Sequence, residues 1–214
     1  MTRKICLVLL VLCLAVPSLA SASTAKERLE LFINDALVIL QDPAYANKDP
    51  EKLKEQRDRL EVVIDGIFDY ALLSQLTVGK PWATFSPDQQ EEFIKAFKTL
   101  LEATYLGSLR GGGSTASGVD ITGESDLGKG KIEITTQVNT TDKEIPIAYR
   151  MIESSDWMVY DVIVEGVSLV KNYRDQFREL LVSKTPDEVI AAVWEKANKK
   201  RESEAESAAG NKEG

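Results

Sequence analysis

Asp161 and Glu165 are the residues whose type and spacing come closest to an acid–base pair. They lie in or just after the segment Trp157 to Val164, which is rich in aromatic and β-branched residues and therefore predicts a strand. Four residues along a strand span about 13 Å, which is too far for two carboxylates to act on one bond. We interpret both as exposed or locally bonded residues at a strand end. Asp161 remains the one carboxylate that an enzyme or small-ligand site could use.

Few other catalytic side chains are available. The chain has no histidine, and its two cysteines, Cys6 and Cys13, lie near the N-terminus. Without histidine there is no Ser–His or Cys–His nucleophile and no histidine base, and zinc loses a usual ligand. Only carboxylate, lysine or tyrosine chemistry remains, which argues against an enzyme and against a zinc site built from histidine or cysteine.

Residues 1–22 have the pattern of a signal peptide. Arg3 and Lys4 precede an apolar run over 5–16, and the small residues Ala20-Ser21-Ala22 follow it. The run is short for a membrane span, so we expect cleavage and export as a soluble protein. The alternative is an uncleaved membrane anchor.

The charge of the chain restricts its partners. The formal net charge is −8, from 34 acidic and 26 basic residues. Cleavage would remove two of the basic residues and both cysteines, leaving a more acidic chain without disulfides. This charge has the wrong sign for binding nucleic acid. The remaining length suits a single domain, which we place at residues 23–198.

The first half of the chain is predicted to be helical, over residues 24–109. Apolar residues recur there at a spacing of three and four, as on amphipathic helices. Capping residues mark three helix starts, at Thr24, Asp49 and Ser86, with proline after the last two, and a short helix is predicted over residues 69–78. The glycine-rich stretch 110–118 that follows contains no Gly-Lys-Ser/Thr motif, so we interpret it as a loop and not a phosphate cradle.

Residues 119–164 are predicted to form an antiparallel sheet of about four strands. The segments 119–122, 131–138, 145–152 and 157–164 show the two-residue alternation of strands and are joined by short polar turns. At Gly166 the period changes to that of a helix, which we start at Val167. A last helix follows Thr185. The C-terminal helices span 167–198, and the charged tail 199–214 is predicted to be disordered. The fold class is therefore α+β, with about six helices around the sheet.

Apolar positions on these elements could either fill a plain core or line a cavity between the sheet and its helices. On the residues alone both remain open. The candidates for a cavity wall are Phe97, Leu101, Tyr105, Ile134, Ile147, Tyr149, Met151, Val159, Ile163, Val167, Val170 and Phe177. Tyr173 and Arg174 are candidates for its mouth, where Arg174 could bind an anionic headgroup. Alternatively, Arg174 could pair with Asp161 or Glu165.

Two segments resemble the MlaC, or toluene-tolerance auxiliary, family of periplasmic phospholipid-binding proteins. The similarity extends from about Thr24 to Trp194. The first segment runs from Phe68-Asp69-Tyr70 to Ser86-Pro87-Asp88-Gln89-Gln90 and on through Phe93, Phe97, Leu100 and Tyr105. The second, more specific segment comprises Tyr160-Asp161-Val162, then Glu165-Gly166-Val167-Ser168-Leu169-Val170, then Asn172-Tyr173-Arg174 and Gln176-Phe177.

The resemblance implies an NTF2-like, cone-shaped fold with a helical annex. It also implies a monomeric periplasmic carrier without a cofactor, which holds phospholipid acyl chains in an apolar pocket formed by the wall candidates above. Its implied partners are an outer-membrane lipoprotein/porin complex and an inner-membrane ABC transporter, between which it moves lipid to maintain outer-membrane asymmetry. The alternatives are a small-ligand enzyme or binding module on the same scaffold, centred on Asp161, and a chaperone for exported polypeptides.

Overall fold

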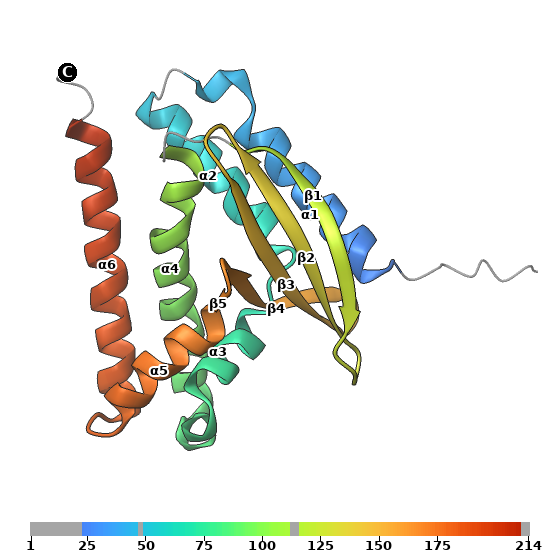
Figure 1. Ribbon diagram of the computed structural model, residues 1–214. Helices are drawn as coiled ribbons and strands as arrows, with labels where there is room; N and C mark the ends of the chain where they lie inside the picture. Colours follow the sequence, from blue (N-terminus) through green and yellow to red (C-terminus); the bar gives the residue numbers. More distant parts are fainter. Residues whose placement is uncertain (1–22, 47–48, 112–115, 211–214) are drawn as a thin grey trace, which may run out of the picture.

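The computed structural model describes residues 23–46, 49–111 and 116–210, with the side chains of 108–111 and 204–210 excepted (Figure 1). The predicted signal peptide, residues 1–22, lies outside this part of the chain, as do residues 112–115 of the glycine-rich stretch. The elements are α1 (Ala25–Leu40), η1 (Pro43–Tyr45), α2 (Pro50–Asp65), α3 (Tyr70–Val78), η2 (Lys80–Thr84), α4 (Pro87–Gly111), β1 (Ala116–Asp126), β2 (Lys131–Thr140), β3 (Glu144–Glu153), β4 (Trp157–Val164), β5 (Val167–Ser168), α5 (Leu169–Leu181) and α6 (Pro186–Gly210).

The helices begin where the capping residues predict. The Thr24 hydroxyl accepts a hydrogen bond from the Glu27 amide at 3.2 Å, and the Glu27 carboxylate accepts one from the Thr24 amide at 2.8 Å. Each bond satisfies an amide that the first helical turn leaves without a partner. The side chains of four other residues accept bonds in the same way at later helix starts: Asp49, Asp69, Ser86 and Thr185.

The sheet has five antiparallel strands in the order β1-β2-β3-β4-β5, one more than predicted. The additional strand has two residues, and its Val167 pairs with Val164 across a tight turn. The prediction that a helix starts at Val167 is therefore wrong. Helix α5 starts at Leu169, because the Ser168 hydroxyl caps it by accepting a bond from the Lys171 amide at 3.0 Å.

The turn between β4 and β5 depends on a glycine. Glu165 has φ 49° and Gly166 has φ 82°, the left-handed pair of values found in two-residue hairpin turns. A Cβ atom at Gly166 would meet nothing within 4 Å, so a side chain there would be opposed only by the backbone conformation.

We expect Gly166→Ala to lower the free energy of unfolding by about 1 kcal/mol, the cost of holding alanine in the left-handed region. Urea denaturation of the purified wild-type and variant proteins measures this change in the free energy of unfolding. Gly118→Ala is the control: that glycine also has room for a Cβ, does not have a left-handed φ, and should change stability little. Equal losses in the two variants would contradict this explanation.

A bulge in β4 decides which residues share a face of the sheet. Arg150 pairs with Asp161 but Met151 pairs with Val159, so Tyr160 is an extra residue in β4. Strict alternation would place Val159 and Ile163 on one face. The bulge instead places them on opposite faces. The face that packs on α1 carries Val119 and Ile121 of β1, Ile132, Ile134, Thr136 and Val138 of β2, Ile145, Ile147, Tyr149 and Met151 of β3, and Val159, Val162 and Val164 of β4. We call it the α1 face.

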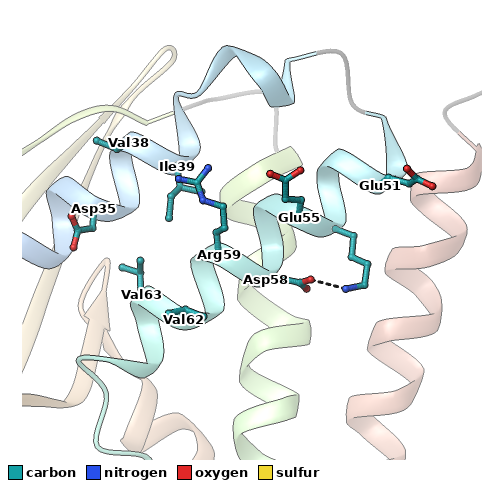
Figure 2. A pocket seen from close by; sticks show the side chains of 10 residues that line it. Asp35, Val38, Ile39, Glu51, Glu55, Asp58, Arg59, Val62 and Val63 are labelled. Atoms are coloured by element: carbon teal, nitrogen blue, oxygen red, sulfur yellow. Dashed lines mark hydrogen bonds and ion pairs between the residues drawn. The ribbon is translucent and has the colours of Figure 1, made fainter.

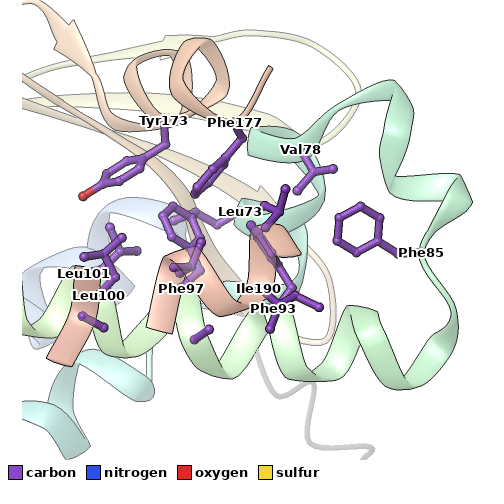
Figure 3. Close-up of a cluster of buried hydrophobic side chains, with 14 of the residues drawn as sticks. Leu73, Val78, Phe85, Phe93, Phe97, Leu100, Leu101, Tyr173, Phe177 and Ile190 are labelled. Atoms are coloured by element: carbon purple, nitrogen blue, oxygen red, sulfur yellow. The ribbon is translucent and has the colours of Figure 1, made fainter. Parts of the chain in front are cut away.

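Three buried clusters hold the layers together. The helical cluster joins α3, α4, α5 and α6 around Phe93, Phe97 and Phe177, whose rings meet at centroid distances of 5.2 to 5.7 Å (Figure 3). The sheet cluster joins α1 to the α1 face through Leu29, Ile134, Met151 and Val159. A third cluster joins α1, η1, α2 and α4 and contains Ile39, Tyr45, Leu60 and Leu106. The architecture is α+β as predicted, and the curled antiparallel sheet is consistent with an NTF2-like fold.

Helix α6 extends further than predicted. It runs beside α4 and continues to Gly210, through most of the segment for which the sequence predicts a disordered tail. That prediction is wrong for residues 199–210, because alanine, glutamate, lysine and arginine favour helix even where no apolar stripe continues. Within the part of the chain that the structure describes, no helix is both long and apolar enough to span a membrane.

Candidate functional site

Asp161 is buried and fully engaged by neighbouring groups. Its side chain is 3 % exposed and accepts hydrogen bonds from the Ser168 hydroxyl at 2.7 Å, the Val170 amide at 2.9 Å and the Arg150 guanidinium at 3.3 Å. Arg150 also binds Glu133 at 2.8 Å. Asp161 thus adds a negative charge at the positive end of α5, where anions are stabilised. Of the two predicted states, exposed or locally bonded, the local bonding of Asp161 is confirmed and the exposure is wrong. These donors occupy the oxygens that an acid–base role would need.

The two mouth candidates are consecutive residues of α5, one buried and one exposed. Arg174 is exposed and donates from Nε to the Leu76 carbonyl at 2.8 Å, because α5 packs on α3. The alternative that pairs Arg174 with Asp161 or Glu165 is therefore wrong. Tyr173 lies in the core and not at an accessible mouth: it is 4 % exposed, and its ring meets Phe97 edge-on at 4.8 Å. Burial raises the pKa of the Tyr173 phenol above its usual value.

The wall candidates divide between two of the buried clusters, with some outside both. Four belong to the helical cluster: Phe97, Leu101, Val170 and Phe177. Four others lie in or pack against the sheet cluster: Ile134, Tyr149, Met151 and Val159. The structure therefore does not bring the twelve candidates together on one surface.

Three wall candidates belong to none of the buried clusters. Val167 is 60 % exposed at the turn into β5, and Tyr105 is 39 % exposed on α4. Ile163 is half-buried on the face opposite α1, because the bulge at Tyr160 reverses the alternation. Val167, Tyr105 and Ile163 therefore do not share a surface with Ile134, Met151 and Val159.

One part of the α1 face is incompletely covered. Ile147, the remaining candidate, pairs with Val164, and Val138 pairs with Ile145 beside them. All four side chains are half-buried and lie outside the three clusters as the described residues define them. We call this set the half-buried patch (Val138, Ile145, Ile147, Val164). It borders the end of α1, where the Gln41 amide donates to the carbonyls of Ala116 and Ser117 at 3.1 and 3.4 Å. Adjacent aliphatic side chains that stay accessible beside a packed core suit an apolar ligand.

A separate groove lies between α1 and α2 (Figure 2). Its volume is about 710 Å³, and it is open and lined largely by charged side chains, including the Lys54–Asp58 ion pair at 2.6 Å. Two exposed valines, Val38 and Val62, form part of its floor. None of the wall candidates lines this groove.

Comparison with protein families identifies the chain. The model of the MlaC protein family matches residues 31–195. The chain belongs to the MlaC family. A solved structure of a phospholipid-binding protein from Ralstonia solanacearum, in complex with a phospholipid, has the same fold with a TM-score of 0.72. It is 22 % identical over 84 % of this chain and 99 % of the Ralstonia chain. A comparison with curated proteins found no significant match.

The MlaC match includes every wall candidate and the whole half-buried patch, whereas the end of α6 lies beyond it. Sequence reasoning missed Val162 and Val164, because no residue signals the bulge that turns them to the α1 face. It also missed Phe68, which packs against both the helical and the sheet clusters and meets Phe32 edge-on at 6.5 Å. The apolar stripe over 25–40 was the available signal for the α1 side of this surface.

Proposed function

We propose that this member of the MlaC family is a periplasmic phospholipid carrier that holds acyl chains on the α1 face, beginning at the half-buried patch. The observation that carries the proposal is the family match over residues 31–195. The phospholipid bound to the Ralstonia protein of the same fold supports the ligand class. The half-buried patch supports the location, because its four aliphatic side chains stay half-buried and lie outside the three buried clusters.

The physical need for such a carrier is large. Each methylene moved from hydrocarbon into water costs about 0.8 kcal/mol, and a diacyl lipid carries roughly 25 to 30 of them. A carrier therefore has to replace the bilayer with protein side chains throughout the transfer. We propose that it receives and delivers lipid by contact with an outer-membrane lipoprotein/porin complex and an inner-membrane ABC transporter, which maintains the lipid asymmetry of the outer membrane. Export would follow from the signal peptide predicted at residues 1–22.

The hydrogen bonds that Asp161 accepts count against the competing enzyme hypothesis. That hypothesis needs a carboxylate free to exchange a proton with a ligand, and Asp161 was its candidate. The oxygens of Asp161 accept bonds from Ser168, Val170 and Arg150. The geometry therefore favours a binding protein, and the chaperone hypothesis gains no specific support from it.

We expect the protein, purified after export, to carry phospholipid at about one molecule per chain. Native mass spectrometry followed by organic extraction and lipid analysis measures both the ratio and the identity of the ligand. A protein that remains empty after purification and after incubation with phospholipid vesicles would contradict the proposed function. A bound peptide in place of lipid would favour the chaperone hypothesis instead.

A further inference from the structure

The Tyr149 hydroxyl is a polar group without a protein partner on an apolar surface. Tyr149 lies in the middle of the α1 face, between Ile134 of β2 and Val162 of β4, and next to Ile147 of the half-buried patch. Among the residues that the structure describes, none forms a hydrogen bond with its hydroxyl. Buried tyrosines usually find such a partner, because an unpaired hydroxyl in apolar surroundings costs free energy.

Three other tyrosines of the chain have such a partner, whereas the buried Tyr160, like Tyr149, has none for its hydroxyl among the described residues. The Tyr45 hydroxyl accepts a bond from Arg59 at 2.8 Å and donates to Glu55 at 3.2 Å. The Tyr70 phenol interacts with Asp65, and the Tyr173 phenol interacts with Thr104 and Tyr105. Tyr149 differs from these three tyrosines because its hydroxyl has no such partner.

The surroundings of Tyr149 are internal although its side chain is only partly covered. Burial raises the pKa of the Tyr149 phenol to about 12, and no charged neighbour contributes to this shift. At the same time the side chain keeps some accessible surface. Tyr149 packs against the sheet cluster, and the part of its side chain that stays accessible is not covered by the described protein. The hydroxyl is thus placed to meet a ligand that lies on the α1 face.

The chemistry of the α1 face limits what the hydroxyl can bind. On β2, β3 and β4 the polar side chains of this face are Thr136 and Tyr149 in its middle and Thr140 and Glu153 at its ends, and it carries no cation. The Thr136 hydroxyl is already used, because it donates to the Ile147 carbonyl at 3.0 Å. A phosphate buried here would lack a positive partner, which is strongly unfavourable. A neutral acceptor embedded in hydrocarbon suits a lone phenol, and the ester carbonyl between an acyl chain and its glycerol is such a group.

We propose that the Tyr149 hydroxyl donates a hydrogen bond to an ester carbonyl of the bound phospholipid, and that the protein therefore selects ester-linked over ether-linked lipids. The inference rests on the proposed function, because it takes a phospholipid as the ligand. A neutral hydrogen bond of this kind contributes about 1 kcal/mol, which corresponds to about fivefold in affinity. The hydroxyl would also set the depth to which the lipid enters, because the carbonyl lies at the junction of chains and headgroup.

A competition experiment tests the proposal. The exported protein is stripped of lipid in detergent and exchanged against vesicles of phosphatidylcholine, half diester and half diether, with the same chains. Native mass spectrometry then gives the ratio of the two lipids on the protein. We expect about fivefold enrichment of the diester on the wild-type protein and a ratio near one on Tyr149→Phe, with thermal stability unchanged because the hydroxyl has no protein partner.

Tyr160→Phe is the matched control. Tyr160 is the extra residue of the β4 bulge, and Lys131 Nζ lies 5.1 Å from the centre of its ring, on the side of the sheet away from α1. This variant should keep the wild-type preference. Equal binding of both lipids by the wild-type protein, or a preference that persists in Tyr149→Phe, would overturn the inference and leave the carrier function intact. Failure of the wild-type protein to take up either lipid would overturn both.

Discussion

Replacing Asp161 with asparagine is expected to lower the free energy of unfolding by about 3 kcal/mol, the upper range for weakening the hydrogen bonds of a buried charged group. The carboxylate joins three elements: β3 through Arg150, β5 through Ser168, and the first turn of α5 through the Val170 amide. Asparagine keeps the shape and one acceptor oxygen. It loses the negative charge that the Arg150 guanidinium and the α5 N-terminus both stabilise, so two interactions weaken together. Urea denaturation followed by tryptophan fluorescence measures the loss.

Glu133→Gln is the control for the Asp161 variant. Glu133 binds the same guanidinium at 2.8 Å, but its side chain is 24 % exposed, against 3 % for Asp161. Solvent screens the more exposed pair, so we expect a loss of about 1 kcal/mol or less. Similar losses in the two variants would show that burial of Asp161 does not matter. The lipid content of the folded Asp161→Asn variant should equal that of the wild-type protein. The enzyme hypothesis instead requires that this variant lose catalytic activity.

Local sequence signals predicted most of the fold. Helix starts were predictable because a capping side chain and the amides it satisfies lie within three residues, as at Thr24 and Thr185. Strands were predictable because apolar residues alternate on β2 and β3. The α5 start was missed by two residues. Val167 fits a helical apolar stripe, but the choice between strand and helix there depends on pairing with Val164 across the sheet.

The candidate site was less predictable because its surfaces are set by contacts between distant residues. The β4 bulge turns Val162 and Val164 toward α1 and Ile163 away from it, and no residue type in Tyr160-Asp161-Val162 requires a bulge. Apolar spacing alone also does not distinguish Phe97, which is packed by other rings, from Ile147, which is not. Periodicity shows that a side chain points inward, but only the assembled layers show whether protein or a ligand covers it.

The same bulge supplies the sharpest test of where the lipid lies. Ile147 and Ile163 are the same residue type, are both half-buried, and lie on neighbouring strands, one register position apart. Ile147 is on the α1 face within the half-buried patch, and Ile163 is on the opposite face. We expect Ile147→Glu to bind lipid at least a hundredfold more weakly, because a carboxylate or its neutralised form beside acyl chains costs about 3 kcal/mol or more. Ile163→Glu should bind lipid like the wild-type protein.

Both variants should fold, since each introduces a charge at a half-buried position, and we expect each to lose about 1 kcal/mol of unfolding free energy. Urea denaturation establishes that the two losses match. Lipid content by native mass spectrometry, and uptake from vesicles of phosphatidylglycerol and phosphatidylethanolamine, then separates the faces. Loss of lipid by Ile163→Glu alone would move the binding surface to the other side of the sheet. If both variants retained lipid, the acyl chains would have to bind at the helical cluster around Phe97 and Phe177. That cluster contains the wall candidates that lie on helices.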